Sequence, residues 1–483
     1  MVMLMVLVFI NGGTLVKGYP EEDLVKKLPG QPDVAFKQYA GYVDVDLDAG
    51  RSLFYYFVEA QGESQVKPLT LWLTGGPGCS SIGQGSFTQV GPFLPNGDGH
   101  SLQCNKMSWN RVSNLLFVDA PAGIGWSYSN RSSDYSVSIE SFTNDMYIFL
   151  MKWLEKFPDF KYTDLFLTGE TYAGHYIPSF VNVLLKHNQN SDDFKFKIKG
   201  IAIGNPTVKL DRDLAASYEF LWSHGMISDE IFMNIKSECD FEKYVRRTYQ
   251  NASETCNTAV DTANRMVGNI NFYNVILDTC PSNVEEQLRL KKTVSKISNG
   301  IDVCMGYEID VYLNLPQVQH AFHANRTKLP YKWSGCSQFL RYNDEDNIKN
   351  MLPLLKIIVG QKIPVWIFRQ ENSLVTYLTE ISLRSISFII LHRSGDQDAI
   401  FSLLGSRSLV RELAEELKYN ITVPYGAWYY KSQVGGWVTE YGNVLTFATV
   451  KGGGKMIGYL QPGRAFQLFK SFVHGERLTK RNT

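Results

Sequence analysis

The chain has 483 residues, of which 44% are hydrophobic and 20% are charged. This composition excludes an intrinsically disordered protein and suits a large folded chain with a substantial core. Basic and acidic residues number 48 each, so the balanced charge argues against nucleic acid or an anionic membrane as a partner.

An apolar run, Val2–Ile10, opens the chain and is followed by small residues before Tyr19. The run is too short to cross a bilayer, and no later segment has the length of a membrane span. We interpret residues 1–18 as an export signal, which predicts a secretory-pathway protein, either secreted or vacuolar. No Lys or Arg precedes the run, so a wrongly assigned start site is the alternative.

Glycosylation motifs and cysteines also favour export. The cysteines fit no zinc or redox motif because the chain has no Cys-x-x-Cys, and in an oxidising compartment they would pair, leaving one over. The acceptor asparagines of the Asn-x-Ser/Thr triplets are Asn130, Asn251, Asn325 and Asn420. The cysteines are Cys79, Cys104, Cys239, Cys256, Cys280, Cys304 and Cys336.

Short apolar runs rich in β-branched and aromatic residues alternate with helical stretches. Each run ends at Gly, Pro, Asn or a polar cluster, which is typical of a buried strand whose functional groups follow on the next loop. Apolar residues at helical spacing predict an amphipathic helix from Ile139 to Leu154. This order predicts an α/β protein with a mostly parallel sheet and helices on both faces. The predicted strands are Leu69–Leu73, Leu115–Val118, Asp164–Leu167, Gly200–Ile203 and Ile363–Phe368.

Two stretches interrupt the alternation. Residues 209–342 are polar and rich in cysteine, and we predict a mostly helical cap inserted between core parts 19–208 and 343–483. Residues 369–393 separate a strand from the loop that follows it, and an insertion of this length is atypical of a compact fold. We interpret this segment as translated intron sequence, with a genuine surface loop as the alternative. Tryptic fragments from within residues 370–392 of the natural protein would exclude the intron.

The chemistry-bearing motif is Gly169-Glu-Thr-Tyr-Ala-Gly174, directly after the strand Asp164–Leu167. Small residues on both sides of a central nucleophile are typical of a tight strand-to-helix elbow, which exposes the nucleophile at the edge of the sheet. Position 171 is then the nucleophile. Alone, the motif also fits an ordinary glycine-rich turn.

Two further glycine loops, Trp72–Ser81 and Pro121–Tyr128, follow predicted strands. With the elbow, they resemble the serine carboxypeptidases, especially the plant serine carboxypeptidase-like proteins, from about Tyr19 to the C-terminus. Phe36–Tyr42 and Val434–Trp437 resemble the peptidase branch more than the acyltransferase branch. The resemblance implies an α/β-hydrolase fold. It also implies an activity that releases C-terminal residues from peptides, or acts on a small acyl substrate, and that needs no metal or organic cofactor.

The resemblance also implies a triad of serine, aspartate and histidine. Here Thr171 occupies the serine position, Asp398 matches the acid, and Lys455 occupies the histidine position. Gly76 and Tyr172 would supply the N–H groups of the oxyanion hole.

A further implied set binds the terminal carboxylate of the substrate. Trp72 and Glu170 match the family, whereas Thr74 replaces an Asn and Gln89 replaces a Glu. Thr at this position resembles the acyltransferase branch, which uses sugar-ester donors but keeps its triad. The resemblance pairs Cys79 with Cys336, Cys239 with Cys256 and Cys280 with Cys304, and leaves Cys104 free.

The two triad changes are unfavourable for hydrolysis. Lys has an ordinary pKa of about 10.4 against about 6.5 for His, and Asp398 would further favour the charged ammonium of Lys455. Thr171 can act as a nucleophile, but its methyl group crowds the elbow. We expect a weakly active or inactive homologue. The alternatives are a non-catalytic binding protein on the same fold and an acyltransferase.

Overall fold

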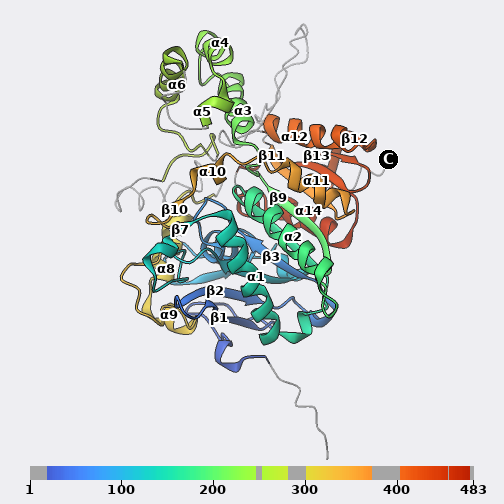
Figure 1. The fold of residues 1–483 in the computed structure, drawn as a ribbon. Coiled ribbons are helices and arrows are strands. Elements are labelled where there is room, and N and C mark those ends of the chain that lie inside the picture. The colour runs from blue at the N-terminus through green and yellow to red at the C-terminus, as the bar shows by residue number, and fades with distance from the viewer. Residues whose placement is uncertain are drawn as a thin grey trace, which may run out of the picture.

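The computed structural model describes residues 19–245, 253–272, 274–280, 301–371, 403–454 and 456–478. Within them, ten strands form one sheet in the order β1-β2-β6-β3-β8-β9-β11-β14-β13-β12 (Figure 1). The bounds of these strands are β1 Gln38–Asp46, β2 Arg51–Val58, β3 Leu69–Leu73, β6 Asn114–Asp119, β8 Leu165–Glu170, β9 Ile198–Gly204, β11 Val365–Glu371, β12 Ile421–Tyr430, β13 Gln433–Tyr441 and β14 Leu445–Lys451.

The centre of the sheet is parallel, from β6 through β3, β8, β9 and β11 to β14. The outer strands at both edges pair antiparallel. The predicted mostly parallel sheet is therefore confirmed. Because parallel strands place their carboxyl ends at one edge, the loops after β3 and β8 meet there. Two short sheets lie beside the main one, formed by β4 (Phe93–Pro95) with β5 (Leu102–Cys104) and by β7 (Ser136–Val137) with β10 (Arg341–Tyr342).

Helices cover both faces of the sheet, as predicted. One face packs against α1 (Ile139–Lys156), α2 (Ala173–Asn190), α11 (Leu352–Gly360) and α12 (Leu403–Glu416). The other face packs against η3 (Ser81–Val90), α8 (Met305–Leu313), α9 (Pro316–Ala321), α13 (Ile457–Leu460) and α14 (Pro462–His474). The predicted amphipathic helix is α1, whose apolar stripe from Ile139 to Leu154 is buried and whose first turn is closed by Ser138 and Ser141.

The stretch expected to be a cap falls into two structurally different parts. Four helices project from the sheet and share a hydrophobic cluster of their own (Figure 1). In contrast, α8 and α9 lie on the sheet and contribute to its core, where Phe322 contacts the rings of Phe54 and Tyr56. The projecting helices are α3 (Leu210–Ser223), α4 (Asp229–Glu238), α5 (Phe241–Val245) and α6 (Glu254–Val267).

Three disulfides join Cys79 to Cys336, Cys239 to Cys256 and Cys280 to Cys304, and Cys104 is an exposed free cysteine. These are the pairs that the family resemblance implies. Among the glycosylation motifs, Asn130 and Asn420 are exposed, Asn325 is half-buried, and Asn251 lies outside the described residues.

Strand β11 extends beyond the predicted run by three residues, to Glu371. The first residue of the expected insertion, Arg369, is fully buried and pairs with Thr449 of β14. The sequence pattern ends the strand too early because an arginine interrupts the apolar run. Residues 372–402 lie outside the described residues.

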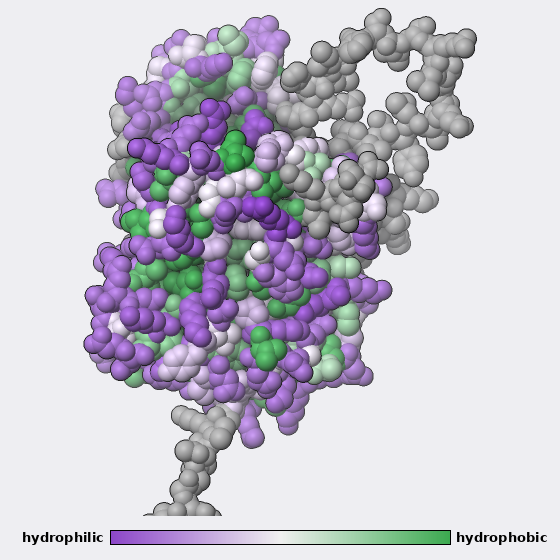
Figure 2. Space-filling view, turned by 90° about the vertical axis from the view of Figure 1, so that its right-hand side faces the viewer, coloured by the Kyte–Doolittle hydropathy of each residue, from purple (hydrophilic) through white to green (hydrophobic). Residues whose placement is uncertain are grey.

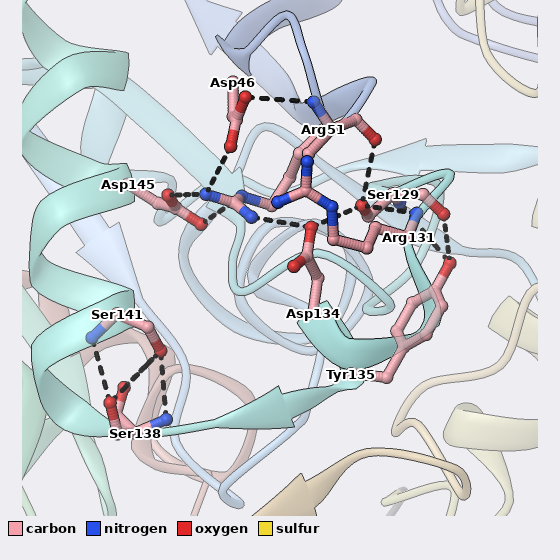
Figure 3. A network of polar contacts seen from close by, with 10 residues as sticks. Asp46, Arg51, Ser129, Arg131, Asp134, Tyr135, Ser138, Ser141 and Asp145 are labelled. Atoms are coloured by element: carbon pink, nitrogen blue, oxygen red, sulfur yellow. Dashed lines mark hydrogen bonds and ion pairs between the residues drawn. The ribbon is translucent and has the colours of Figure 1, made fainter.

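Arg51 joins strand β2 to two later elements (Figure 3). Its guanidinium forms ion pairs with Asp134 at 2.6 Å and Asp145 at 2.9 Å, and lies 3.4 Å from Asp46. Burial raises the pKa of Asp145 to about 6, and Arg51 opposes this shift. These contacts hold α1 and the loop after β6 against the sheet.

The surface face shown in Figure 2 is mostly hydrophilic, and its hydrophobic residues lie in small separate groups. No helix in the described part of the chain combines the length and apolar character needed to cross a bilayer.

Candidate active site

Thr171 lies at a strained elbow between β8 and α2. Its φ is 55°, a left-handed conformation that is an outlier for a β-branched residue. Its backbone is fixed by hydrogen bonds from Thr171 N to Gly204 O at 2.9 Å and from Thr207 N to Thr171 O at 3.0 Å. The elbow geometry predicted for position 171 is therefore present in the structure.

The elbow requires small neighbours on both sides. A Cβ at Gly169 would lie 2.1 Å from Leu73 O, and a Cβ at Gly174 would lie 2.2 Å from Thr207 O. Both positions are too close to backbone to accept a side chain. This explains the glycines of the motif.

Gly75, in the loop after β3, lies against the elbow. A Cβ there would lie 2.1 Å from Thr171 Oγ1 and 2.3 Å from Tyr172 N. The loop after β3 thus contacts the elbow directly, and the adjacent Gly76 and Tyr172 are the residues expected to form the oxyanion hole. Within the described residues, the turn and loop backbone bonds include no acceptor for either N–H. Two such N–H groups on one edge can stabilise a developing oxyanion.

Thr171 Oγ1 is buried and has no hydrogen-bond partner within the described part of the chain. The expected acid, Asp398, and the residue at the base position, Lys455, both lie outside the described residues. The buried His175, in the first turn of α2, stacks on the Tyr172 ring with the ring centroids 4.6 Å apart. Burial lowers the pKa of His175 to about 4, so it is neutral, and it does not bond to Thr171.

The four residues expected to bind a carboxylate lie close together as two bonded pairs. Trp72 Nε1 donates to Thr74 Oγ1 at 2.9 Å, and Gln89 Nε2 donates to Glu170 Oε1 at 3.0 Å. Gln89 Nε2 also donates to Gln84 O at 3.0 Å, so both of its protons are used. Gln89 Oε1 is a buried acceptor without a partner among the described residues. A carboxylate needs donors, and this set offers it mainly acceptors.

Gln89 lies on η3, a π-helix, a rare element that is frequent at functional sites. Its start is held by the buried Asp119, which accepts hydrogen bonds from Ser80 Oγ at 2.7 Å and Ile82 N at 3.2 Å. Burial raises the pKa of Asp119 to about 7, and these two bonds oppose the shift. The sequence contains no periodicity that predicts such a helix.

A cavity of about 570 Å³ is lined by Gly76 and by the Cys79–Cys336 disulfide. Residues of η3, α8 and α13 line it. No group of three or more His, Cys, Asp or Glu side chains in the described chain is arranged to hold a metal ion. The loop after β3 thus connects the two features, with Gly75 at the elbow and Gly76 in the lining of the cavity.

The structure brings together seven of the residues expected at the site, and sequence reasoning missed others. Gly75 stands in the same glycine loop as Gly76, so the sequence contains its motif, but only the structure reveals its contact with the elbow. Gln84 and Asp310, which face the cavity, carry no motif. The seven residues are Trp72, Thr74, Gly76, Gln89, Glu170, Thr171 and Tyr172.

The serine carboxypeptidase family matches the chain in two stretches, residues 29–380 and 369–475, which meet inside the segment expected to be an insertion. Serine carboxypeptidase-like 42 from Arabidopsis thaliana is 57% identical over 476 residues, covering 98% of this chain and 95% of its own length. Serine carboxypeptidase-like 41 from the same plant is 54% identical over 474 residues, covering 98% and 96%.

Among solved structures, Kex1(delta)p, a prohormone-processing carboxypeptidase from Saccharomyces cerevisiae, superimposes with a TM-score of 0.73 at 20% identity. The match covers 96% of this chain and 98% of that one. It confirms the fold. The two plant relatives confirm the resemblance first seen in the three glycine loops.

Proposed function

Because the chain belongs to the serine carboxypeptidase family, we propose that it binds peptides in the cleft beside Thr171 but releases their C-terminal residues slowly or not at all. The observation that carries this proposal is the elbow itself. Its backbone geometry is intact, while its side chain is a threonine whose Oγ1 has no partner within the described residues.

The sequence also supports the proposal, because it lacks a histidine at the position of the catalytic base. None of the eight histidines stands in the loop of Lys455, where the family has its histidine. If the compartment has a pH of roughly 5, deprotonating an ordinary lysine takes about 7 kcal/mol. Loss of triad function lowers rates by several orders of magnitude, leaving the contribution of the oxyanion hole and of binding.

The residues expected to bind the substrate's terminal carboxylate support slow release of C-terminal residues, independently of the triad. Both protons of Gln89 Nε2 are used within the protein, and the N–H of Trp72 is held by Thr74. A peptide carboxylate would have to displace these bonds. The protein therefore departs from its family both in catalysis and in recognition of the chain end.

Acyl transfer is a second candidate, favoured by the single observation that Thr74 Oγ1 accepts the Trp72 N–H. This hydroxyl could in turn donate to an ester or sugar oxygen. Ester formation from a sugar-ester donor would favour it over peptide binding.

The disulfides and the plant relatives are consistent with a protein of the secretory pathway. We propose a secreted or vacuolar location, with glycans at the exposed Asn130 and Asn420. Glycosidase-sensitive mass at these two asparagines tests the assignment.

The deciding experiment compares the wild type with Thr171→Ser, Lys455→His and the double variant, using N-blocked dipeptides as substrates. We expect the double variant to raise kcat/KM by at least about a thousandfold, and each single variant to do little, because triad members act as a unit. Asp398→Ala in the double background is the control and should abolish the gain. Appreciable hydrolysis by the wild type that Asp398→Ala removes would contradict the proposal. Calorimetry with the same peptides separately measures binding without turnover.

A further inference from the structure

The cavity beside Gly76 has a distinct charge. The described residues that line it include two carboxylates, Asp302 and Asp310, and no lysine, arginine or histidine. The other described lining residues are uncharged, and Trp333 and Tyr459 are among them. The two carboxylates contribute a negative potential to these described walls, and a low-dielectric wall strengthens that contribution.

The two carboxylates differ in what they do for the fold. Asp302 Oδ1 accepts the backbone N–H of Cys304 at 2.8 Å, which fixes the turn that precedes α8. Asp310 stands near the end of α8, and its Oδ1 accepts the backbone N–H of Gly335 at 3.1 Å. No further side-chain hydrogen bond or ion pair to its carboxylate occurs in the described residues.

Asp310 is only half-buried, yet burial raises its pKa to about 6, with the Gly335 bond opposing the shift. A partly desolvated carboxylate without a cationic partner is unfavourable for the protein alone. A cation entering the cavity would remove this penalty. Asp310 lines the same cavity as Gly76, the residue expected to stabilise the reacting carbonyl.

We propose that Asp310 selects substrates with a cationic side chain, that of lysine or arginine, adjacent to the bond held at Thr171. The proposal rests on the proposed peptide-binding function for its substrate, whereas the cation preference of the cavity rests on the cavity alone. Asp310 is a specificity-determining residue in this proposal, and it takes no part in bond cleavage.

The test measures dissociation constants by calorimetry for 4-phenylbutylamine and 4-phenylbutanol, which differ in charge and need only the cavity. We expect the wild type to bind the amine roughly tenfold more tightly than the alcohol at pH 7.5 and low salt, and the difference to disappear in Asp310→Asn. Asp302→Asn is the matched control and should keep the preference. Asp310→Glu keeps the charge and should retain part of it.

Equal binding of amine and alcohol by the wild type, binding of neither, or an amine preference that Asp310→Asn leaves intact would each overturn the proposal. N-acetyl tetrapeptides with Lys or Met at each of the last two positions are measured in parallel. If no peptide binds but the amine preference depends on Asp310, the peptide function fails and the cation site stands. If peptides bind and the amine binds no more tightly than the alcohol, the peptide function stands and the cation site fails. Should Asp310→Asn not fold, Asp310→Ser replaces it, with thermal unfolding as the check.

Discussion

Gln89 Nε2 donates a 3.0 Å hydrogen bond to Oε1 of Glu170, and both side chains are almost fully buried. The bond joins η3 to the last residue of β8, immediately before the elbow. An amide donor facing a carboxylate needs no extra proton, so this contact does not depend on a shared hydrogen. By the resemblance, the family has two glutamates here. Two carboxyl groups at this separation have to share one proton.

Gln89→Glu should make the stability of the protein depend on pH. Two buried carboxyl groups at this separation raise one pKa of the pair above its unfolded value. A raised carboxyl pKa gives stability at low pH that is lost as pH rises through the folded pKa. A shift of about two units would lower the free energy of unfolding of the variant, relative to wild type, by about 3 kcal/mol between pH 4 and pH 7. Chemical denaturation at both pH values measures this.

The control for this change reverses the pair, with Gln89→Glu and Glu170→Gln together. One amide and one carboxyl are then restored, so the pH-dependent loss should largely disappear. An equal loss of unfolding free energy in the single and the reversed variant would show that the stability of the site depends on side-chain shape and not on the protonation of the pair.

Thr171→Gly should stabilise the protein by about 1 kcal/mol. The substitution relieves a left-handed conformation that disfavours a β-branched residue and removes a buried hydroxyl without a described partner, which outweighs the lost methyl packing. Thr168→Gly, on the same strand in extended conformation, is the control. It loses buried contacts with no strain relief and should cost about 2 kcal/mol. Urea unfolding of both variants provides the comparison, and a loss at Thr171 would show that the elbow is not strained.

Gly75→Ala should disrupt the contact between the loop after β3 and the elbow. The new methyl would meet Thr171 Oγ1, Tyr172 N and Glu170 O within 2.6 Å, and two of these atoms are backbone. Overpacking of this kind typically costs about 1–3 kcal/mol. Gly306→Ala on α8 has no atom within 4 Å of its new methyl and should be neutral or slightly stabilising. Similar unfolding midpoints for the two variants would contradict a tight contact at Gly75.

The sheet and the elbow could be predicted from the sequence because each depends on local signals. Buried parallel strands are short apolar runs, and the elbow needs small residues at fixed spacing on either side of position 171. The family resemblance placed Gln89 and Glu170 in one binding set, but their direct hydrogen bond and the setting of Asp310 could not be predicted, since they depend on contacts between distant segments. Asp310 bonds to Gly335 across 25 residues of sequence, and Gln89 bonds to Glu170 across 81.

Arg369 shows the same limit at the end of β11. The sequence suggests that the core strand ends before it, yet its guanidinium is fully buried and donates to Ser406 Oγ at 2.7 Å and to Pro206 O at 3.2 Å. Thr207, the next residue after Pro206, donates its N–H to Thr171 O. Arg369 therefore supports the backbone on which the elbow rests, and only the tertiary structure reveals this role.

The buried pair of Arg369 and Asp213 gives the last prediction. Their nearest atoms are 3.8 Å apart, and burial raises the pKa of Asp213 to about 7 while Arg369 opposes the shift. Arg369→Met removes the only opposing cation that contacts Asp213 in the described chain and should lower the free energy of unfolding by about 3–5 kcal/mol at pH 8. The deficit should shrink toward pH 5, because a carboxyl group with a raised folded pKa destabilises the protein as pH rises through that pKa.

Adding Asp213→Leu should recover most of the loss, because an apolar pair of similar volume has no buried charge to desolvate. A double variant no more stable than Arg369→Met at pH 8 would mean that the arginine acts through Pro206 and Ser406 and not through Asp213.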